Sequence, residues 1–220
     1  MTLSTIKLET GTNPTVSIIW MHGLGADGND FVPIVKELDL HGCPAIRFVF
    51  PNAPHIPVSV NGGYVMPAWY DIRSGDIVSR EDEAGLRASQ AAIEELIQIE
   101  QANGAKKIIL AGFSQGCAMA LQTGLRHSTP LTGLLCLSGY LPLNQTLEKE
   151  RSAANQSVPI FMAHGTVDPV IVISRAKQSR DVLTQQGYQI EWHEYSMPHT
   201  VSMEEIVDIG NWLRKVLKND

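Results

Sequence analysis

Residues 106–127 read KKIILAGFSQGCAMALQTGLRH, and this stretch decides the fold. An apolar run typical of a β-strand leads into the pentapeptide GFSQG at 112–116, and a helix of small residues follows. A serine between two glycines at a strand-to-helix turn projects its hydroxyl from a strained corner, while the next backbone amides face the same space. Gly112 and Gly116 leave room for the strand, the helix and a substrate. The pentapeptide alone also arises by chance, but in this context it predicts that Ser114 is a nucleophile.

Segments typical of strands alternate with segments typical of helices along the rest of the chain. We expect strands at Thr5–Leu8, Val16–Met21, Ala45–Phe50, Ile108–Ala111, Leu131–Leu137, Val158–Ala163 and Gln189–Tyr195. We expect helices at Asn29–Leu38, from a capping box at 79–82 to about Ala102, and at about 115–127, 171–186 and 202–217. Strands separated by helices form right-handed β-α-β units and a mostly parallel sheet. The order therefore predicts an α/β fold, and the length favours a single domain over residues 1–220.

Composition excludes several classes of function. The 17 basic and 23 acidic side chains give a net charge of −6, and no basic stretch could follow a phosphate backbone, so we expect no nucleic-acid partner. The amino terminus lacks the pattern of a secretory signal, and no apolar run approaches the roughly 20 residues of a membrane span. The three cysteines match no disulfide or metal-site spacing. We therefore predict a cytoplasmic protein with no integral membrane segment and no bound metal.

The nucleophile needs a base, and the position of each later histidine in the chain distinguishes the candidates. A serine hydroxyl is activated by a histidine that a carboxylate holds in place, and on such a sheet the chain order is serine, acid, histidine. His127 closes the helix that follows Ser114, and His193 lies inside a predicted strand. His164 ends a strand, but no candidate acid at a strand end lies between it and the serine. His199 occupies a proline-marked loop between the last strand and the last helix, so we predict that it is the general base.

The acid is expected in the loop at 164–169, directly after a predicted strand. Asp168 lies there, at the strand end where active groups collect in a parallel sheet. An aspartate before Pro169 is also a common way to begin a helix, so a capping role is the alternative. Asp181 and Asp208 fall in predicted helices, where a solvated face explains them. Chain order and the strand-end position favour Asp168 as the residue that orients the base.

Two backbone amides should stabilise the oxyanion. One is the amide of Gln115, directly after the nucleophile. The other is expected in the glycine-rich loop at 22–28, which follows the buried strand Val16–Met21. The loop lacks the G-x-x-x-x-G-K-[ST] pattern of a phosphate-binding loop, and a plain tight turn is the other alternative. We predict the amide of Leu24 as the second donor.

Taken together, these segments resemble the phospholipase/carboxylesterase family. The motifs that carry the resemblance are HGLGADGND at 22–30, GFSQGCAMAL at 112–121, HGTVDPV at 164–170 and MPHTV at 197–201, with PNAP at 51–54, NGG at 61–63, AWYDI at 68–72 and LSGYLP at 137–142. The family includes acyl-protein thioesterases and small bacterial carboxylesterases, which have a compact α/β-hydrolase fold. The resemblance extends from about Trp20 to Leu213. It implies that Ser114, Asp168 and His199 form a triad and that the amides of Leu24 and Gln115 form the oxyanion hole.

The expected chemistry is hydrolysis of an ester or thioester through an acyl-enzyme, with no cofactor. Residues 51–80, with four prolines and two adjacent glycines, should set substrate fit, because long irregular stretches in compact domains are usually functional. Val65, Met66, Pro67 and Trp69 give this stretch an apolar tract suited to an acyl chain, although core packing explains Trp69 equally well. The chain has no large inserted cap domain, so we expect a shallow, open site.

The sequence leaves the substrate and two other functions open. Small esters, lysophospholipids or other lipid-like acyl esters, and acylated proteins all need similar machinery, and the chain is expected to be a monomer or a homodimer. A serine peptidase or a non-catalytic binding protein on the same fold are the alternatives. The complete order of serine, aspartate and histidine argues against a binding protein, which needs none of the three.

Overall fold

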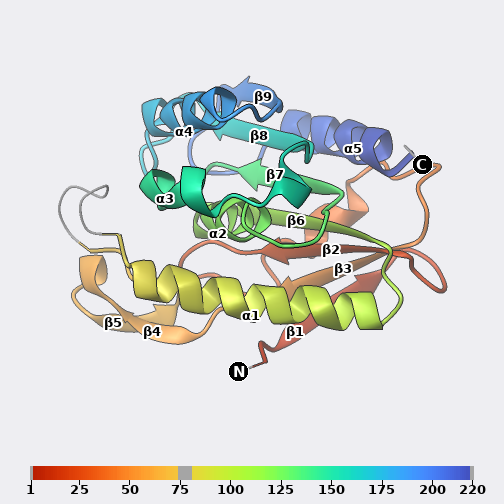
Figure 1. The fold of residues 1–220 in the computed structure, drawn as a ribbon, viewed down its shortest axis with the longest axis horizontal. Helices are drawn as coiled ribbons and strands as arrows, with labels where there is room; N and C mark the ends of the chain where they lie inside the picture. The colour runs from red at the N-terminus through yellow and green to blue at the C-terminus, as the bar shows by residue number, and fades with distance from the viewer. Residues whose placement is uncertain (1, 74–80, 219–220) are drawn as a thin grey trace.

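The computed structural model describes residues 2–73 and 81–218, and a seven-stranded sheet runs through its centre (Figure 1). The strands are β1 Thr5–Glu9, β2 Val16–Met21, β3 Ile46–Pro51, β6 Lys107–Phe113, β7 Gly133–Leu137, β8 Ile160–Gly165 and β9 Ile190–Tyr195. Their order across the sheet is β1-β3-β2-β6-β7-β8-β9. The edge strand β1 runs antiparallel to β3, and every other pairing is parallel. The mostly parallel sheet predicted from the sequence is confirmed.

Helices cover both faces of this sheet. They are α1 Glu83–Ala102, α2 Gln115–Gly124, α3 Asn144–Glu150, α4 Ile173–Gln185 and α5 Met203–Lys218, with short 3-10 turns η1 Pro33–Lys36, η2 Ser59–Asn61 and η3 Ala153–Asn155. Neighbouring residues of one strand enter different cores: Ile19 packs with residues of α1 to α4, and Ile18 packs with residues of η1 and α5. Successive side chains of a strand point to opposite faces. The two hydrophobic cores therefore lie on opposite sides of one sheet.

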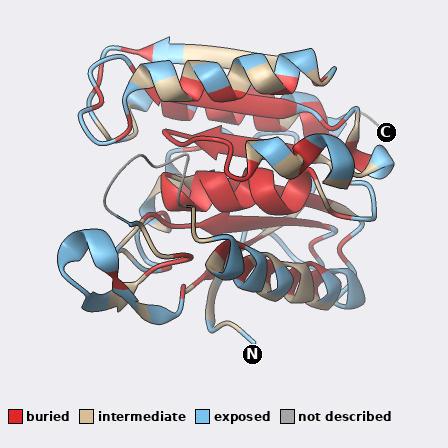
Figure 2. Ribbon diagram, turned by 60° about the vertical axis from the view of Figure 1, so that its left-hand side comes forward, coloured by how far each residue is buried: buried red, intermediate tan, exposed pale blue. Residues whose placement is uncertain are grey.

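Burial on both faces explains the composition of the central elements. All six residues of β2 are buried, as expected for a parallel strand covered on both sides. Helix α2 is also buried all round, and Figure 2 shows it uniformly red at the centre of the molecule. Helix α1 is buried on one stripe only, which includes Leu86, Ile93 and Ile97. The helix that carries the predicted nucleophile at its start is thus fixed by packing on every side.

The helix expected at Asn29–Leu38 is absent from the structure, so that prediction was wrong. The structure has turns there, followed by the short 3-10 segment η1. The Asp27 carboxylate accepts the Asn29 amide at 2.7 Å, a local bond that competes with helix formation. Pro33 has no N–H to continue a helical ladder. Helix α1 begins after Asp82, whose side chain accepts the Gly85 amide, whereas positions 79 and 80 of the expected capping box lie outside the described residues.

The structure also contains elements that the sequence did not predict. Strands β4 His55–Val58 and β5 Tyr64–Pro67 form a separate antiparallel hairpin within the stretch treated as irregular, and α3 was not expected. The other predicted strands and helices are present, with ends shifted by a few residues.

The crossover between β3 and β6 decides where a site forms. From β2 the chain continues to β3 on one side, and after the hairpin and α1 it returns to β6 on the other side of β2. The carboxyl ends of β2 and β6 are adjacent, with Met21 paired with Gly112. In open parallel sheets the crevice beyond such a switch point is where ligands bind.

Candidate active site

Ser114 occupies a strained turn between β6 and α2. Its φ of 57° and ψ of −117° lie outside the regions that non-glycine residues favour. The backbone amide of Ser114 donates to the Leu137 carbonyl at 2.9 Å, which ties the turn to the end of β7. A Cβ on Gly112 would collide with the backbone of Gly116, and a Cβ on Gly116 would collide with the Met21 carbonyl. Both glycines are required by the close approach of strand and helix, and the turn matches the geometry of a nucleophile elbow.

His199 and Asp168 meet at the same end of the sheet. Asp168 follows β8, His199 follows β9, and His199 Nδ1 lies 2.6 Å from Asp168 Oδ2. The two loops are tied together, because the Thr166 amide donates to the Tyr195 carbonyl at 2.8 Å. The His199 ring centroid lies 4.7 Å from that of Phe113, the residue before Ser114. The structure therefore brings the predicted base and acid together beside the turn that carries the predicted nucleophile.

The carboxylate of Asp168 uses its two oxygens for different tasks. Oδ1 accepts the amides of Val170 and Ile171 at 2.8 and 2.9 Å, whereas Oδ2 accepts from His199. Burial disfavours the charged form, but the bond from His199 and the two amides together hold the pKa of Asp168 below its ordinary value. Asp168 is not the N-cap of α4, whose cap is Val172. The capping role considered from the sequence is therefore wrong: Oδ1 closes a local turn before α4, and Oδ2 contacts His199.

The glycine-rich loop after β2 lies against the nucleophile. A Cβ on Gly23 would lie 3.3 Å from the Cβ of Ser114. His22 anchors this loop: its Nε2 accepts the Ala53 amide at 3.1 Å, so Nδ1 carries the proton and donates to the Gly23 carbonyl at 2.7 Å. Burial lowers the pKa of His22, which favours this neutral tautomer. The loop of Leu24 is thereby fixed next to Ser114.

The amide of Gln115 begins α2, where the first-turn amides have no partner within the helix and the dipole favours negative charge. The side chain of Gln115 has a second task that the sequence did not reveal. Its Oε1 accepts the Trp69 amide at 3.0 Å, and its Nε2 donates to the Tyr70 carbonyl at 2.8 Å. The carboxamide therefore attaches the segment after β5 to the nucleophile turn.

The hairpin segment predicted to bind substrate divides into exposed and buried parts. Val65 on β5 is 56% exposed, and Met66 and Pro67 are partly buried. The Pro67 carbonyl accepts the Gly25 amide at 2.9 Å, which joins β5 to the glycine-rich loop. Trp69 is buried, and its indole N–H donates to the His22 carbonyl at 2.9 Å. Trp69 therefore packs beneath the loop, and substrate contact by this segment remains a prediction.

Sequence reasoning assigned no role to two buried histidines beside the predicted site, His22 and His164. Each is followed by glycine, and each stands at or directly after the carboxyl end of a strand, β2 or β8. That repeated His-Gly pair was a usable signal. It was overlooked because His164 was judged only as a candidate base.

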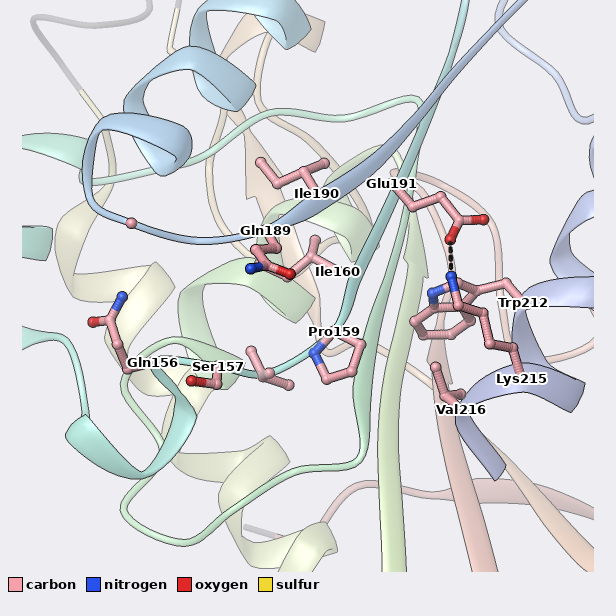
Figure 3. Close-up of a pocket in the computed structure, with 12 residues that line it drawn as sticks. Gln156, Ser157, Pro159, Ile160, Gln189, Ile190, Glu191, Trp212, Lys215 and Val216 are labelled. Atoms are coloured by element: carbon pink, nitrogen blue, oxygen red, sulfur yellow. Dashed lines mark hydrogen bonds and ion pairs between the residues drawn. The ribbon is translucent and has the colours of Figure 1, made fainter. Parts of the chain in front are cut away.

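A pocket lies at the end of the sheet opposite to the predicted site (Figure 3). This pocket of about 560 Å³ lies where β8 and β9 begin, beside the last turns of α5, and is lined by Trp212, Val216 and the Glu191–Lys215 ion pair among others. None of the predicted site residues lines it. Within residues 2–73 and 81–218, no group of three or more His, Cys, Asp or Glu side chains is gathered as metal ligands. No helix in that part of the chain is long and apolar enough to cross a membrane.

Comparison with known proteins identifies the family of the chain and its fold. A family model described as phospholipase/carboxylesterase matches residues 7–217. Acyl-protein thioesterase 1 of Yarrowia lipolytica is 38% identical over 97% of each chain, and its counterpart in Debaryomyces hansenii is 35% identical over 97% of each chain. The crystal structure of Zea mays acyl-protein thioesterase 2 superposes with a TM-score of 0.87 at 29% identity, covering 97% of this chain and 99% of the maize chain. The predicted α/β-hydrolase fold is confirmed.

Proposed function

Because the chain belongs to the phospholipase/carboxylesterase family, we propose that it hydrolyses carboxylic esters and acyl thioesters through Ser114, His199 and Asp168. The observation that carries the proposal is the 2.6 Å contact between His199 Nδ1 and the buried Asp168 carboxylate, beside the strained Ser114 turn. A carboxylate that holds one imidazole nitrogen fixes the tautomer whose other nitrogen is free to accept a proton.

Acylation follows from this arrangement. Since Nδ1 of His199 is bound to Asp168, Nε2 is the nitrogen that removes the Ser114 hydroxyl proton as Oγ attacks the acyl carbonyl carbon. The carbonyl oxygen becomes negative in the tetrahedral intermediate. The amides of Leu24 and Gln115 are the proposed donors to that oxygen, and loss of one such donor costs about 10²–10³ in rate in comparable enzymes.

Acylation ends and deacylation then repeats the same steps with water. To end acylation, His199 gives its proton to the leaving alcohol or thiol as the intermediate collapses to an acyl-serine. His199 then removes a proton from water, whose oxygen attacks the acyl carbon, and the imidazolium returns that proton to Ser114 as the acid departs. The negative Asp168 stabilises the imidazolium in both halves, in agreement with its lowered pKa.

The proposed substrate is an acyl ester, either a small or lipid-like molecule or an acylated protein. Exposed apolar side chains on the loop that carries Asp168 and on the hairpin segment support an apolar acyl chain. They are Val167, Val170 and Val172 on the first, and Val60, Tyr64 and Val65 on the second. The two curated relatives named above are acyl-protein thioesterases, which favours a thioester on a protein. Lysophospholipid cleavage, a cytoplasmic location and a monomeric or dimeric state remain expectations from the sequence.

A fluorophosphonate probe tests the nucleophile. We expect it to label the wild-type protein and not Ser114→Ala, and we expect Ser114→Ala to lose p-nitrophenyl ester hydrolysis as well. Ser157→Ala, at the distant pocket of Figure 3, is the matched control and should keep both. Labelling that persists in Ser114→Ala would overturn the proposal. Rates for matched esters and thioesters of increasing acyl length then identify the substrate class.

A further inference from the structure

Asp168 Oδ2 lies between two imidazoles, only one of which belongs to the proposed triad. His199 Nδ1 is 2.6 Å away, and His164 Nε2 is 3.4 Å away. The His164 side chain is fully buried near the end of β8. The mechanism proposed above gives it no task.

The hydrogen bonds of His164 determine its tautomer. Nε2 lies 2.7 Å from the Ile171 carbonyl oxygen, which can only accept, so Nε2 carries a proton. Nδ1 is buried and has no hydrogen-bond partner among the residues that the structure describes. Burial lowers the pKa of His164, so the ring is neutral and Nδ1 is an unpaired acceptor. An apolar side chain would fill the same space without burying an unpaired nitrogen, so packing alone does not explain an imidazole here.

We propose that His164 is a positioning residue for Asp168. Its Nε2–H group lies near both the Ile171 carbonyl and Asp168 Oδ2, holds the carboxylate in the orientation that faces His199, and limits the negative charge that His199 experiences. A separation of 3.4 Å is long for a hydrogen bond, so the second contact is mainly electrostatic, which burial strengthens. This inference rests on the proposed function, because it assigns a role within the same triad.

The consequence for His199 has a definite sign. Among the described residues, three donors bind the Asp168 carboxylate, namely the amides of Val170 and Ile171 and His199, and the His164 N–H lies near it as well. Removing the His164 donor leaves more negative charge at Oδ2, which stabilises protonated His199. The pKa of His199 then rises, and less of the base is neutral at a given pH.

Another charged group near His164 must stay constant in the test. Glu194 on β9 pairs with His164 in the strand register and influences its pKa. Its carboxylate is bound by Lys177 of α4 at 2.9 Å. Substitutions confined to position 164 leave this ion pair in place, so a change in the pKa of His199 reports the lost imidazole.

Two amide variants separate the positioning role from loop support. In His164→Gln the amide nitrogen reaches about as far as Nε2, whereas in His164→Asn it reaches only the position of Nδ1. His127→Asn is the matched control, because His127 is a buried histidine bonded to Thr129 outside the predicted site. Titration of His199 by NMR in protein with labelled histidine is the primary readout. The pH profile of kcat/KM for ester hydrolysis is the second.

We expect His164→Asn to raise the pKa of His199 by about 0.5–1 unit, in the range of ordinary environmental shifts. The acid limb of kcat/KM should move to higher pH by the same amount, with a loss of roughly 3- to 10-fold below the new pKa. His164→Gln should restore both towards wild type, and His127→Asn should change neither. A merely structural His164 predicts lower stability with an unchanged pKa of His199, and that result, or an equal shift in both variants, would overturn the proposal.

The unmodified protein provides a test that does not depend on variant folding. Nitrogen-15 spectra at neutral pH must show His164 neutral with its proton on Nε2, and the Nδ1 tautomer or a charged ring would overturn the proposal. The NMR measurements also need no turnover. If the wild-type protein hydrolyses no ester while the pKa of His199 shifts as expected, the proposed function fails and the positioning role survives.

Discussion

The two His-Gly segments both lie at the carboxyl end of a parallel strand, but their imidazole rings differ in hydrogen bonding. His22, directly after β2, uses both ring nitrogens: Nδ1 donates to Gly23 and Nε2 accepts from Ala53. His164, in β8, bonds through Nε2, and its Nδ1 has no partner in the described part of the chain. A buried imidazole with hydrogen bonds at both ring nitrogens is typical of a side chain that fixes a loop. An imidazole that is hydrogen-bonded through one nitrogen only and lies beside a charged carboxylate instead favours an electrostatic role. The same dipeptide therefore has two different roles in this protein.

The largest effect on turnover is expected where His164 and His199 meet, at Asp168. Asp168→Asn keeps the size of the side chain but removes the charge, and its amide favours the wrong tautomer of His199. We expect kcat for ester hydrolysis to fall by about 10⁴. The solvent-facing Asp181→Asn is the control and should keep full activity. A loss below tenfold in Asp168→Asn would remove the carboxylate from the mechanism.

A smaller effect is expected at the first histidine. His22→Leu leaves the Ala53 amide and the Gly23 carbonyl without their partners, which should lower the free energy of unfolding by about 2–3 kcal/mol. Displacement of the loop of Leu24 should reduce kcat by roughly 10². His164→Leu loses only one hydrogen bond and should destabilise less. Denaturant unfolding of both variants measures the difference, and equal losses would contradict the contrast between the two histidines.

Glu205 on α5 can be compared with His164, because it is a buried ionisable group that is not in contact with Asp168. Neither carboxyl oxygen has a hydrogen-bond partner within residues 2–73 and 81–218, and burial raises the pKa of Glu205 to about 8. The folded protein thus binds a proton that the unfolded chain releases above pH 4.5, so the stability this proton confers is complete below about pH 4.5 and lost as pH rises towards 8.

Glu205→Gln should abolish this pH dependence and leave turnover unchanged. Between pH 5 and pH 8 we expect the variant to gain about 1–3 kcal/mol in unfolding free energy relative to wild type. Urea denaturation at several pH values measures the gain. A constant difference across that range would show that Glu205 is ionised in the folded protein, and an altered pH profile of hydrolysis would place it in the site.

The fold was predictable where the pattern was local. The continuous apolar run of β2 identified a strand buried on both faces, and Gly104, with φ of +95°, ended α1 where expected. The hairpin of β4 and β5 was missed because Pro57 and Pro67 are unusual in strands, and only a separate two-stranded sheet accommodates them. The helix predicted at Asn29–Leu38 does not form because the Asp27 carboxylate accepts the Asn29 backbone amide, a local bond that competes with helix formation.

The sequence by itself determined the alternation of strands and helices, the serine at the β6–α2 turn, and the chain order of serine, aspartate and histidine. These features depend on residue types and spacing along the chain. Only the tertiary structure decided that one Asp168 oxygen, Oδ2, faces both imidazoles, which nitrogen of His22 and His164 carries the proton, and that the Gln115 side chain holds Trp69. Proton positions are set by hydrogen-bond partners, and the Asp168–His199, His22–Ala53 and Gln115–Trp69 contacts join residues about 30 or more positions apart.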